Sequence, residues 1–351
     1  MTWQTSDQGS ITVPTTKATL IVSVALLALV AACGDGGGDQ EAESTPTLIP
    51  SLTAEKSAAS AAEVCAATPQ VLGSVGSPEL IEISGIAASR QHDDVLWAHN
   101  DSGDTPRVFA MSMRGEHLAT YALAGAEAID WEDMAIGPGP VEGVDYLYLA
   151  DIGDNDAVRP EIAVYRVREP DVGTDATPAA ELADVEKLTL RYPGAAHDAE
   201  TLLVDPVRGD LLIVTKEVRG GNALVFRTPG TLAAGTTATL EQVAEIDFSA
   251  LRSQVQIPPD APPLVSGLPR LATGGDVSPA GNLVAIRTYS TVWVWTRPEG
   301  APLWESFAGA PCEGASTIEQ QGEALGFDAD GTGYITVSEG TTPPLNYFKA
   351  Q

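Results

Sequence analysis

Acidic side chains stand at matching points along this sequence, at the start and the end of short apolar stretches. Glu132, Glu200 and Glu323 each open such a stretch, whereas Asp151 and Glu339 each close one. Carboxylates that are brought close together disfavour joint ionisation unless cations lie among them. Carboxylate oxygens are also the ligands that Ca²⁺ takes in proteins. These residues therefore indicate a cation-binding site, provided that the fold brings them together.

The acidic positions belong to a unit that recurs five times along the chain. Each unit has a polar entry residue, an apolar strand, a turn that begins five residues after the entry residue, and a second strand with an ionisable tip. The constant offset between entry residue and turn indicates a repeat. The entry residues are Ser84, Glu132, Glu200, Thr273 and Glu323; the turns begin at Ser89, Gly137, Asp205, Ser278 and Asp328; the tips are Asp101, Asp151, Lys216, Arg287 and Glu339.

Repeats of this size with four short strands each predict an all-β protein, a single β-propeller of five blades, with six blades as the alternative count. The last strand of the fourth unit is expected at Leu303–Phe307. The fifth unit reaches the end of the chain after three strands, the last at Leu345–Lys349. We expect residues 70–75 to supply its fourth strand, so that the N-terminal and C-terminal strands close the ring and remove an open edge.

The first strand of each propeller blade lines the central channel, and antiparallel pairing places its start beside the end of the second strand. Entry residues and second-strand tips should therefore meet on one axial face, together with the adjoining loops. The expected ligand-binding residues are Glu132, Glu200, Lys216, Arg287, Glu323, Glu339 and Arg159. The expected metal ligands are Asp101, Asp104, Asp151, Asp154 and Asn155.

Two of the acidic motifs have a structural interpretation beside the metal-binding one. The stretch 151–156 places three carboxylates and an amide within six residues, but such side chains also cap their own backbone in Asx-type turns. The stretch 99–104 has the same two interpretations. His99 and His197 are placed to reach the axial face, where acid–base work competes with a hydrogen-bonded structural role.

Several motifs at these positions carry a resemblance to known propellers: Ser84-Gly-Ile86, 97–104, Asp130-Trp-Glu-Asp133, 151–155, Asp198-Ala-Glu200 and Thr215-Lys-Glu217. Over residues 80 to 350 the chain resembles a family of secreted bacterial β-propeller lipoproteins with no assigned activity. A looser resemblance runs to calcium-binding gluconolactonase-type propellers and to phytase-type β-propellers, which place carboxylates at the same axial face. That resemblance implies Ca²⁺ as the cofactor and hydrolysis as the activity. A polyphosphate substrate needs many Lys and Arg side chains, and this face offers few.

The N-terminal region has the pattern of an exported protein. Residues 18–32 form an apolar run that is shorter than the roughly 20 residues of a membrane-spanning helix and follows Lys17, as in a signal-peptide core. Val30-Ala-Ala-Cys33 resembles the lipobox of bacterial lipoproteins, which implies cleavage before Cys33 and lipidation of its thiol. An ordinary signal peptide with an incidental cysteine is the alternative. We expect a signal peptide at 1–32, a flexible tether at 33–66 and the propeller at 67–351.

The remaining cysteines form a candidate disulfide. If Cys33 carries lipid, only Cys65 and Cys312 are left, and disulfides persist outside the cytoplasm. One intramolecular pairing is then available, and it joins the segment before the first repeat to the loop before the last. Two unpaired cysteines are the alternative.

The chain has 48 acidic and 19 basic residues, a formal charge of −29. Such a field repels nucleic-acid phosphates, so no nucleic-acid partner is expected. We expect a monomer held outside the cytoplasmic membrane by its lipid anchor. Three functions remain open: a module that binds Ca²⁺ and a small-molecule or protein ligand, a metal-dependent hydrolase of phosphate esters or lactones, and a scaffold for envelope proteins. The proline-containing connection 249–271 is expected to pack over or beside the axial face; a degenerate extra blade strand and a loop folded away along the rim are the alternatives.

Overall fold

The computed structural model describes residues 58–172, 180–230, 232–251, 268–317 and 319–350. All of these residues belong to one compact unit, residues 55–351. The expected signal peptide, Cys33 and most of the expected tether lie outside the described residues, as does most of the connection 249–271. Within the described ranges, no helix is both long enough and apolar enough to cross a membrane.

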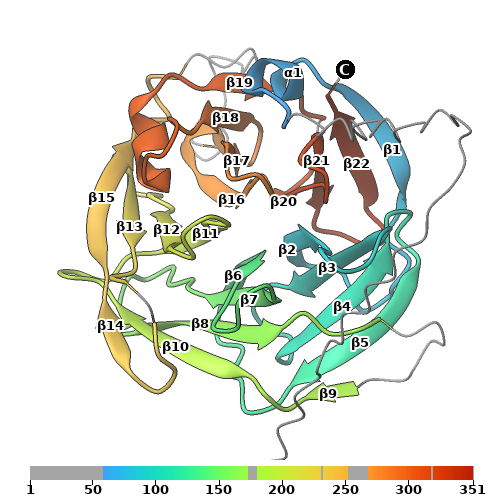
Figure 1. The fold of residues 1–351 in the computed structure, drawn as a ribbon, viewed down its shortest axis with the longest axis horizontal. Helices are drawn as coiled ribbons and strands as arrows, with labels where there is room; N and C mark the ends of the chain where they lie inside the picture. Colours follow the sequence, from blue (N-terminus) through green and yellow to red (C-terminus); the bar gives the residue numbers. More distant parts are fainter. Residues whose placement is uncertain (1–57, 173–179, 231, 252–267, 318, 351) are drawn as a thin grey trace, which may run out of the picture. The chain divides into compact units, whose positions relative to one another are not determined.

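Five sheets, antiparallel except for one short parallel edge strand in each of two sheets, surround a common axis as the blades of a β-propeller (Figure 1). The structure thus confirms the all-β prediction and the count of five blades. The strands, blade by blade, are β2 (Ile83–Ala88), β3 (Val95–Asn100), β4 (Arg107–Ser112), β5 (His117–Leu123) and β9 (Ala180–Leu182); β6 (Trp131–Pro138), β7 (Asp145–Asp151), β8 (Ile162–Arg168), β10 (Glu186–Arg191) and β14 (Thr237–Thr239); β11 (Ala199–Val204), β12 (Leu211–Thr215), β13 (Ala223–Arg227) and β15 (Glu241–Ile246); β16 (Ala272–Val277), β17 (Leu283–Thr288), β18 (Val292–Thr296) and β19 (Cys312–Gly314); β20 (Gly322–Phe327), β21 (Gly333–Ser338), β22 (Pro344–Lys349) and β1 (Thr68–Ser74).

The last blade is closed by strands from both ends of the described chain. β1 pairs antiparallel with β22 and forms the outer edge of the blade that begins with β20. The two strands lie side by side in Figure 1. The prediction that an N-terminal strand completes the fifth blade is confirmed, and the ring has no blade with a missing strand.

The hydrophobic core consists of five clusters, each between two neighbouring blades. Trp97, Trp131 and Tyr165 join blades 1 and 2, for example, and Trp295 packs with residues of blade 3. Because the large side chains lie between the sheets, apolar burial holds the blades against one another.

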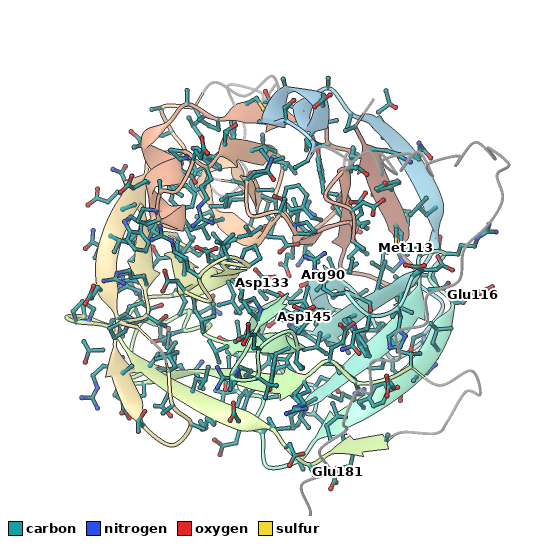
Figure 2. The ribbon with its side chains drawn as sticks, viewed as in Figure 1. Arg90, Met113, Glu116, Asp133, Asp145 and Glu181 are labelled. Carbon is teal, nitrogen blue, oxygen red and sulfur yellow. A yellow bond between two sulfur atoms is a disulfide. The ribbon has the colours of Figure 1, made fainter. Side chains whose placement is uncertain are left out.

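Close to the axis, small residues and buried carboxylates replace the large side chains. A Cβ at Gly274 of β16 would lie 2.4 Å from the carbonyl oxygen of Glu323 in the next blade. Asp133 of β6 lies near the axis (Figure 2) and accepts hydrogen bonds from the backbone N–H groups of Leu202 at 2.9 Å and Gly275 at 3.2 Å. This carboxylate therefore connects the inner strands of three blades.

The structure differs from the expected strands in two places. The segment expected as the strand Leu303–Phe307 is a 3-10 helix, η2 (Leu303–Ala308), and β19 is the outer strand instead. Pro302 precedes η2. Leu303 and Ser306 are buried whereas Glu305 is exposed, a spacing of three that suits a 3-10 turn and not a strand, in which residues 303 and 305 would share a face. The short strands β9 and β14 were not expected. β9 pairs in parallel with β5 at the edge of blade 1, and β14 pairs in parallel with β10 at the edge of blade 2.

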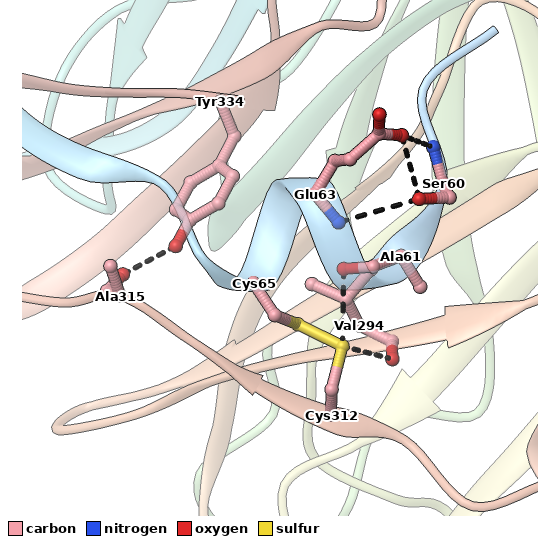
Figure 3. Close-up of a disulfide and its surroundings, with 8 residues drawn as sticks. All are labelled: Ser60, Ala61, Glu63, Cys65, Val294, Cys312, Ala315 and Tyr334. Carbon is pink, nitrogen blue, oxygen red and sulfur yellow. Dashed lines mark hydrogen bonds between the residues drawn. A yellow bond between two sulfur atoms is a disulfide. The ribbon is translucent and has the colours of Figure 1, made fainter. Parts of the chain in front are cut away.

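A short helix, α1 (Ala61–Cys65), fastens the start of the domain to the ring. Ser60 and Glu63 form a capping box at its first turn, and Val64 is fully buried against blades 4 and 5. Cys65 forms a disulfide with Cys312 of β19 (Figure 3). The ordered domain therefore begins before residue 67, within the segment assigned to the tether, and the expected cysteine pairing is present.

We predict that the disulfide contributes strongly to stability. It joins residues 247 positions apart, and closing so long a loop contributes about 5 kcal/mol in the chain-entropy model. Reduction should lower the free energy of unfolding by about 3–5 kcal/mol, measured by denaturant titration. In the Cys65→Ser/Cys312→Ser variant, reductant should have no effect. Equal midpoints for the oxidised and reduced wild-type protein would contradict the prediction.

Candidate functional site

Every blade contains a β-bulge at the same place, the start of its innermost strand. In blade 2, Trp131 pairs with Asp151 and Asp133 pairs with Ala150, so Glu132 is the extra residue. A bulge of this kind redirects a side chain out of the regular alternation. The bulged residues are Ser84, Glu132, Glu200, Thr273 and Glu323, which are the five entry residues of the repeat.

The bulges and the neighbouring second-strand tips gather acidic side chains on one face of the ring. We call this set the axial acidic site. Its electrostatically interacting members come from blades 1, 2, 3 and 5. They are Asp101, Asp130, Glu132, Asp198, Glu200, Glu323 and Glu339.

One part of the site has the spacing of a metal-binding group. Asp101, Asp130 and Glu132 each offer a carboxylate oxygen, and these oxygens lie within 4.8 Å of one another. Gly153 lies directly against this group, because a Cβ there would be 2.1 Å from Glu132 Oε1 and 2.5 Å from Asp130 Oδ2. The backbone at Gly153 thus approaches the two carboxylates where a side chain would displace them.

Beside Glu200 of blade 3, a lysine is held between an acid and a phenol. Lys216 Nζ donates to the carboxylate of Glu200, lies 3.0 Å from the hydroxyl of Tyr289 and sits 5.2 Å from the centre of its ring. Burial by itself would lower the pKa of Lys216, but Glu200 and Tyr289 raise it above its usual value. The ammonium group therefore stays charged and pairs with Glu200, and its charge also acts to lower the pKa values of Asp101, Glu132 and Glu339.

Burial and mutual repulsion raise the pKa values of the axial carboxyl groups. Burial, with Asp101 and Asp198 nearby, raises the pKa of Asp130 to about 6. Burial, with Glu200 and Glu339 nearby, raises the pKa of Glu323 to about 10. For Glu132, burial is again the first cause of a pKa well above its usual value. In the absence of a cation, the site therefore retains protons at neutral pH.

The structure brings together six of the twelve residues predicted for the site. Four others form ion pairs around it, and Asp154 and Asn155 belong to the turn at 151–156. Asp101, Glu132, Glu200, Lys216, Glu323 and Glu339 face one another, as described above. The guanidinium of Arg159 binds Asp151 at 2.8 Å, that of Arg287 binds Glu319 at 2.8 Å, and that of Arg107 binds Asp104 at 2.9 Å.

The stretch 151–156 forms a turn. Asp154 Oδ2 accepts from the backbone N–H of Arg159 at 2.6 Å, and the carbonyl oxygen of Asp154 accepts from Ala157. The backbone N–H of Asp154 donates to Asp198 at 2.9 Å. Asn155 is exposed. These contacts correspond to the Asx-type interpretation of the motif, and they fix the loop beside the axial acidic site.

Sequence reasoning did not select three residues that the structure places in or beside the site: Asp130, Asp198 and Tyr289. A signal for the first two was present, because Asp130-Trp-Glu132 and Asp198-Ala-Glu200 place an aspartate two positions before the bulged glutamate. No comparable signal marks Tyr289, which reaches Lys216 from the turn after β17. His99 is fully buried below the face, with its Nδ1 2.8 Å from the carbonyl oxygen of Asn100.

Two cavities lie on different faces of the ring. One of about 150 Å³ adjoins the axial acidic site and is lined by Asn155, His197, Asp198, Lys216 and Glu217. A larger one of about 360 Å³ is lined by turn residues such as Pro138, Pro206 and Gly209, at the opposite ends of the inner strands. The smaller cavity is the relevant one, because it shares Asp198 with the axial acidic site and Lys216 with the ion pair beside it.

No family model and no curated protein sequence matches the chain. A gluconolactonase from Xanthomonas campestris is a solved structure with a similar chain path. The two chains are 13% identical, the match covers 84% of this chain and 94% of that chain, and the TM-score is 0.43. At this identity and TM-score, the match supports no conclusion about the family or the activity of this chain.

We predict that the axial carboxyl groups make stability fall as the pH rises when no divalent cation is present. The pKa of Glu323 is about 10 in the folded protein, whereas its ordinary value is 4.5. Between these two pH values the folded state binds more protons than the unfolded state, so the free energy of unfolding falls as the pH rises. Glu323→Gln, which is neutral, should raise the free energy of unfolding at pH 8 by on the order of 2 kcal/mol and flatten its pH dependence.

The measurement is thermal unfolding in chelator between pH 6 and pH 8. Glu116→Gln is the matched control, since Glu116 is exposed and belongs to the turn before β5. The interpretation fails if Glu323→Gln is less stable than wild type at pH 8 while the control is unchanged.

Proposed function

We propose that this protein is an extracytoplasmic β-propeller that binds Ca²⁺ at the axial acidic site and presents it to a ligand. The observation that carries the proposal is the group formed by Asp101, Asp130 and Glu132, whose carboxylate oxygens lie within 4.8 Å of one another. Oxygens that bind one Ca²⁺ at about 2.4 Å are separated by at most about 4.8 Å, so the three oxygens fit a single coordination sphere.

The chemistry of the donors supports a hard divalent cation. All three residues offer carboxylate oxygen, which suits Ca²⁺ and not a soft metal. Glu132 is only 3% exposed, and a buried carboxylate is costly unless it is paired. Lys216 is bound to Glu200 and Arg159 to Asp151. Their charges act on the group only from a distance, and neither base forms an ion pair with its three carboxylates. A bound cation would therefore supply the positive charge that no neighbouring side chain places directly against these carboxylates.

The position of the protein in the cell is part of the proposal. The apolar run 18–32 and Cys33 support export and lipid anchoring, on the sequence grounds given above. The Cys65–Cys312 disulfide is of the kind that persists outside the cytoplasm. Millimolar Ca²⁺, which weak extracellular sites require, is compatible with that compartment.

Added Ca²⁺ should raise the melting temperature of the chelated protein. A ligand that binds only the folded state at about 100 times its Kd adds about 2.7 kcal/mol to stability. Glu132→Gln should lower the affinity for Ca²⁺ at least tenfold, so that a higher Ca²⁺ concentration is needed for the same increase in melting temperature. The reason is that it removes the most buried ligand. Differential scanning calorimetry from micromolar to millimolar Ca²⁺ measures both effects.

The matched control is Asp156→Asn, a change in an exposed carboxylate on a neighbouring loop. It should leave the Ca²⁺-dependent shift unaltered. A melting temperature that stays constant over the whole range of Ca²⁺ would refute calcium binding by the folded protein.

A metal-dependent hydrolase of phosphate esters or lactones is the second candidate function. The observation that favours it is the Lys216–Glu200–Tyr289 arrangement beside both the axial acidic site and the 150 Å³ cavity. A bound cation would supply an activated water. Lys216 would stabilise negative charge that develops on the substrate, and Glu200 would hold the ammonium group in place.

If the protein is such a hydrolase, a screen of phosphate esters and lactones should find turnover that chelator abolishes. Lys216→Met should then lower kcat by about 10²–10³, the usual cost of removing one charge-stabilising group. The Ca²⁺-dependent shift in melting temperature should persist in this variant. Turnover that survives chelation, or that is unchanged in Lys216→Met, would exclude this mechanism.

A further inference from the structure

Asp101 belongs to two different groups of three carboxylates. With Asp130 and Glu132 it forms the group described above, and with Glu323 and Glu339 it forms a second one. In each group the ligand oxygens lie within 4.8 Å of one another. Asp101 directly follows β3 of blade 1, so it stands between blades 2 and 5, which supply the other ligands.

We propose that the axial acidic site holds two divalent cations bridged by the carboxylate of Asp101. This inference rests on the proposed function, because it adds a second ion to the first. The first ion is held by Asp101, Asp130 and Glu132. The second is held by Asp101, Glu323 and Glu339.

Glu323 gives independent evidence for a ligand in the second group. It is 5% exposed, and its Oε2 has no hydrogen-bond partner among the residues that the structure describes. The β-bulge at this residue directs the side chain toward Asp101 and Glu339. Leaving a buried carboxylate oxygen without a partner is costly. Without a cation, the protonated carboxyl group of Glu323 forms a hydrogen bond with Glu339. A cation at this point takes the place of that proton and gives Oε2 a partner.

The charges on the face favour a cation, not an anion, as the second occupant. The basic side chains named above are already engaged: Lys216 with Glu200, Arg159 with Asp151, Arg287 with Glu319 and Arg107 with Asp104. One divalent ion near Asp130 and Glu132 leaves Glu323 and Glu339 without an ion pair among the described residues, since Lys216 acts on Glu339 only from a distance. Like charges so close together repel strongly in a buried site.

The geometry also suits a shared ligand. A carboxylate has two oxygens, and each can bind one ion, as in two-metal centres whose ions lie about 3.5–4 Å apart. With one oxygen of Asp101 on each ion, two further carboxylates raise the count to at most five oxygens even when both are bidentate, below the six to eight that Ca²⁺ takes. The remaining positions on each ion are therefore open to water or to a ligand of the face.

The test is calorimetric titration with Ca²⁺ of the whole protein after a chelator has removed its divalent cations and has itself been removed. Wild type should bind two ions per chain. Glu339→Gln, a neutral change in a partly exposed side chain, should bind one ion with its Kd within about threefold of the tighter wild-type site. Asp130→Asn should also bind one ion. Asp101→Asn should weaken both steps at least tenfold, and Asp156→Asn should still bind two.

The outcomes separate this inference from the proposed function. A single ion in wild type, lost in Asp130→Asn and unaffected by Glu339→Gln, overturns the second ion and leaves the first in place. No binding at all overturns both. Circular dichroism identifies variants that do not fold; if Glu339→Gln is one of them, Glu323→Gln takes its place, with the same expected loss of one ion. Titration with Tb³⁺ as a luminescent substitute should give the same numbers.

Discussion

The inner strands of the five blades converge on one axis, and the rest of the structure depends on how the chain meets this constraint. The blades are separate sheets, so the backbone groups at the axis lack a regular partner strand. Small residues such as Gly274 allow the close approach. Buried carboxylates supply acceptors: Asp133 receives the N–H groups of Leu202 and Gly275, and Asp276 receives that of Phe327. Large apolar side chains are left to fill the wider spaces between blades, where the five clusters lie.

The same convergence produces the candidate site. A β-bulge at the start of each inner strand turns one side chain out of the regular alternation, and five such strands direct these side chains to one face. Where the residue is Ser84 or Thr273 the site gains little charge, and where it is Glu132, Glu200 or Glu323 it gains a buried carboxylate. Burial raises the pKa values of these groups because the surrounding protein solvates charge poorly. The proposed cation site therefore arises from repetition of one local irregularity.

Much of the fold could be predicted from the period of the sequence, because five entry residues with a fixed offset determine the number of blades and the face on which their starts meet. The contents of the site were less predictable, because ion pairs depend on loops that the repeat does not describe. Arg287 of β17 forms an ion pair with Glu319, which lies in the loop before β20. Arg159 forms an ion pair with Asp151, eight residues earlier in the chain. Asp130 and Asp198 could have been found from their common spacing to the bulged glutamates, whereas Tyr289 has no such pattern. The prediction of residues 303–307 as the outer strand of blade 4 was wrong. Leu303 and Phe307 are apolar and four residues apart, a spacing that occurs in helices and short loops as well as in strands.

The axial carboxylates oppose folding, since each is more easily ionised in the unfolded chain than in the folded protein. The ring stays folded despite this free-energy cost because many interactions away from the axis stabilise it. Inter-blade clusters, the pairing of β1 with β22 and the Cys65–Cys312 disulfide all hold the blades together at a distance from the axis. Bound cations would then act on a framework that is already closed, so they would change the charge and hydration of the face more than the arrangement of the blades. The outer ring supplies rigidity, and this separation lets the axis retain side chains that are unfavourable until a ligand is present.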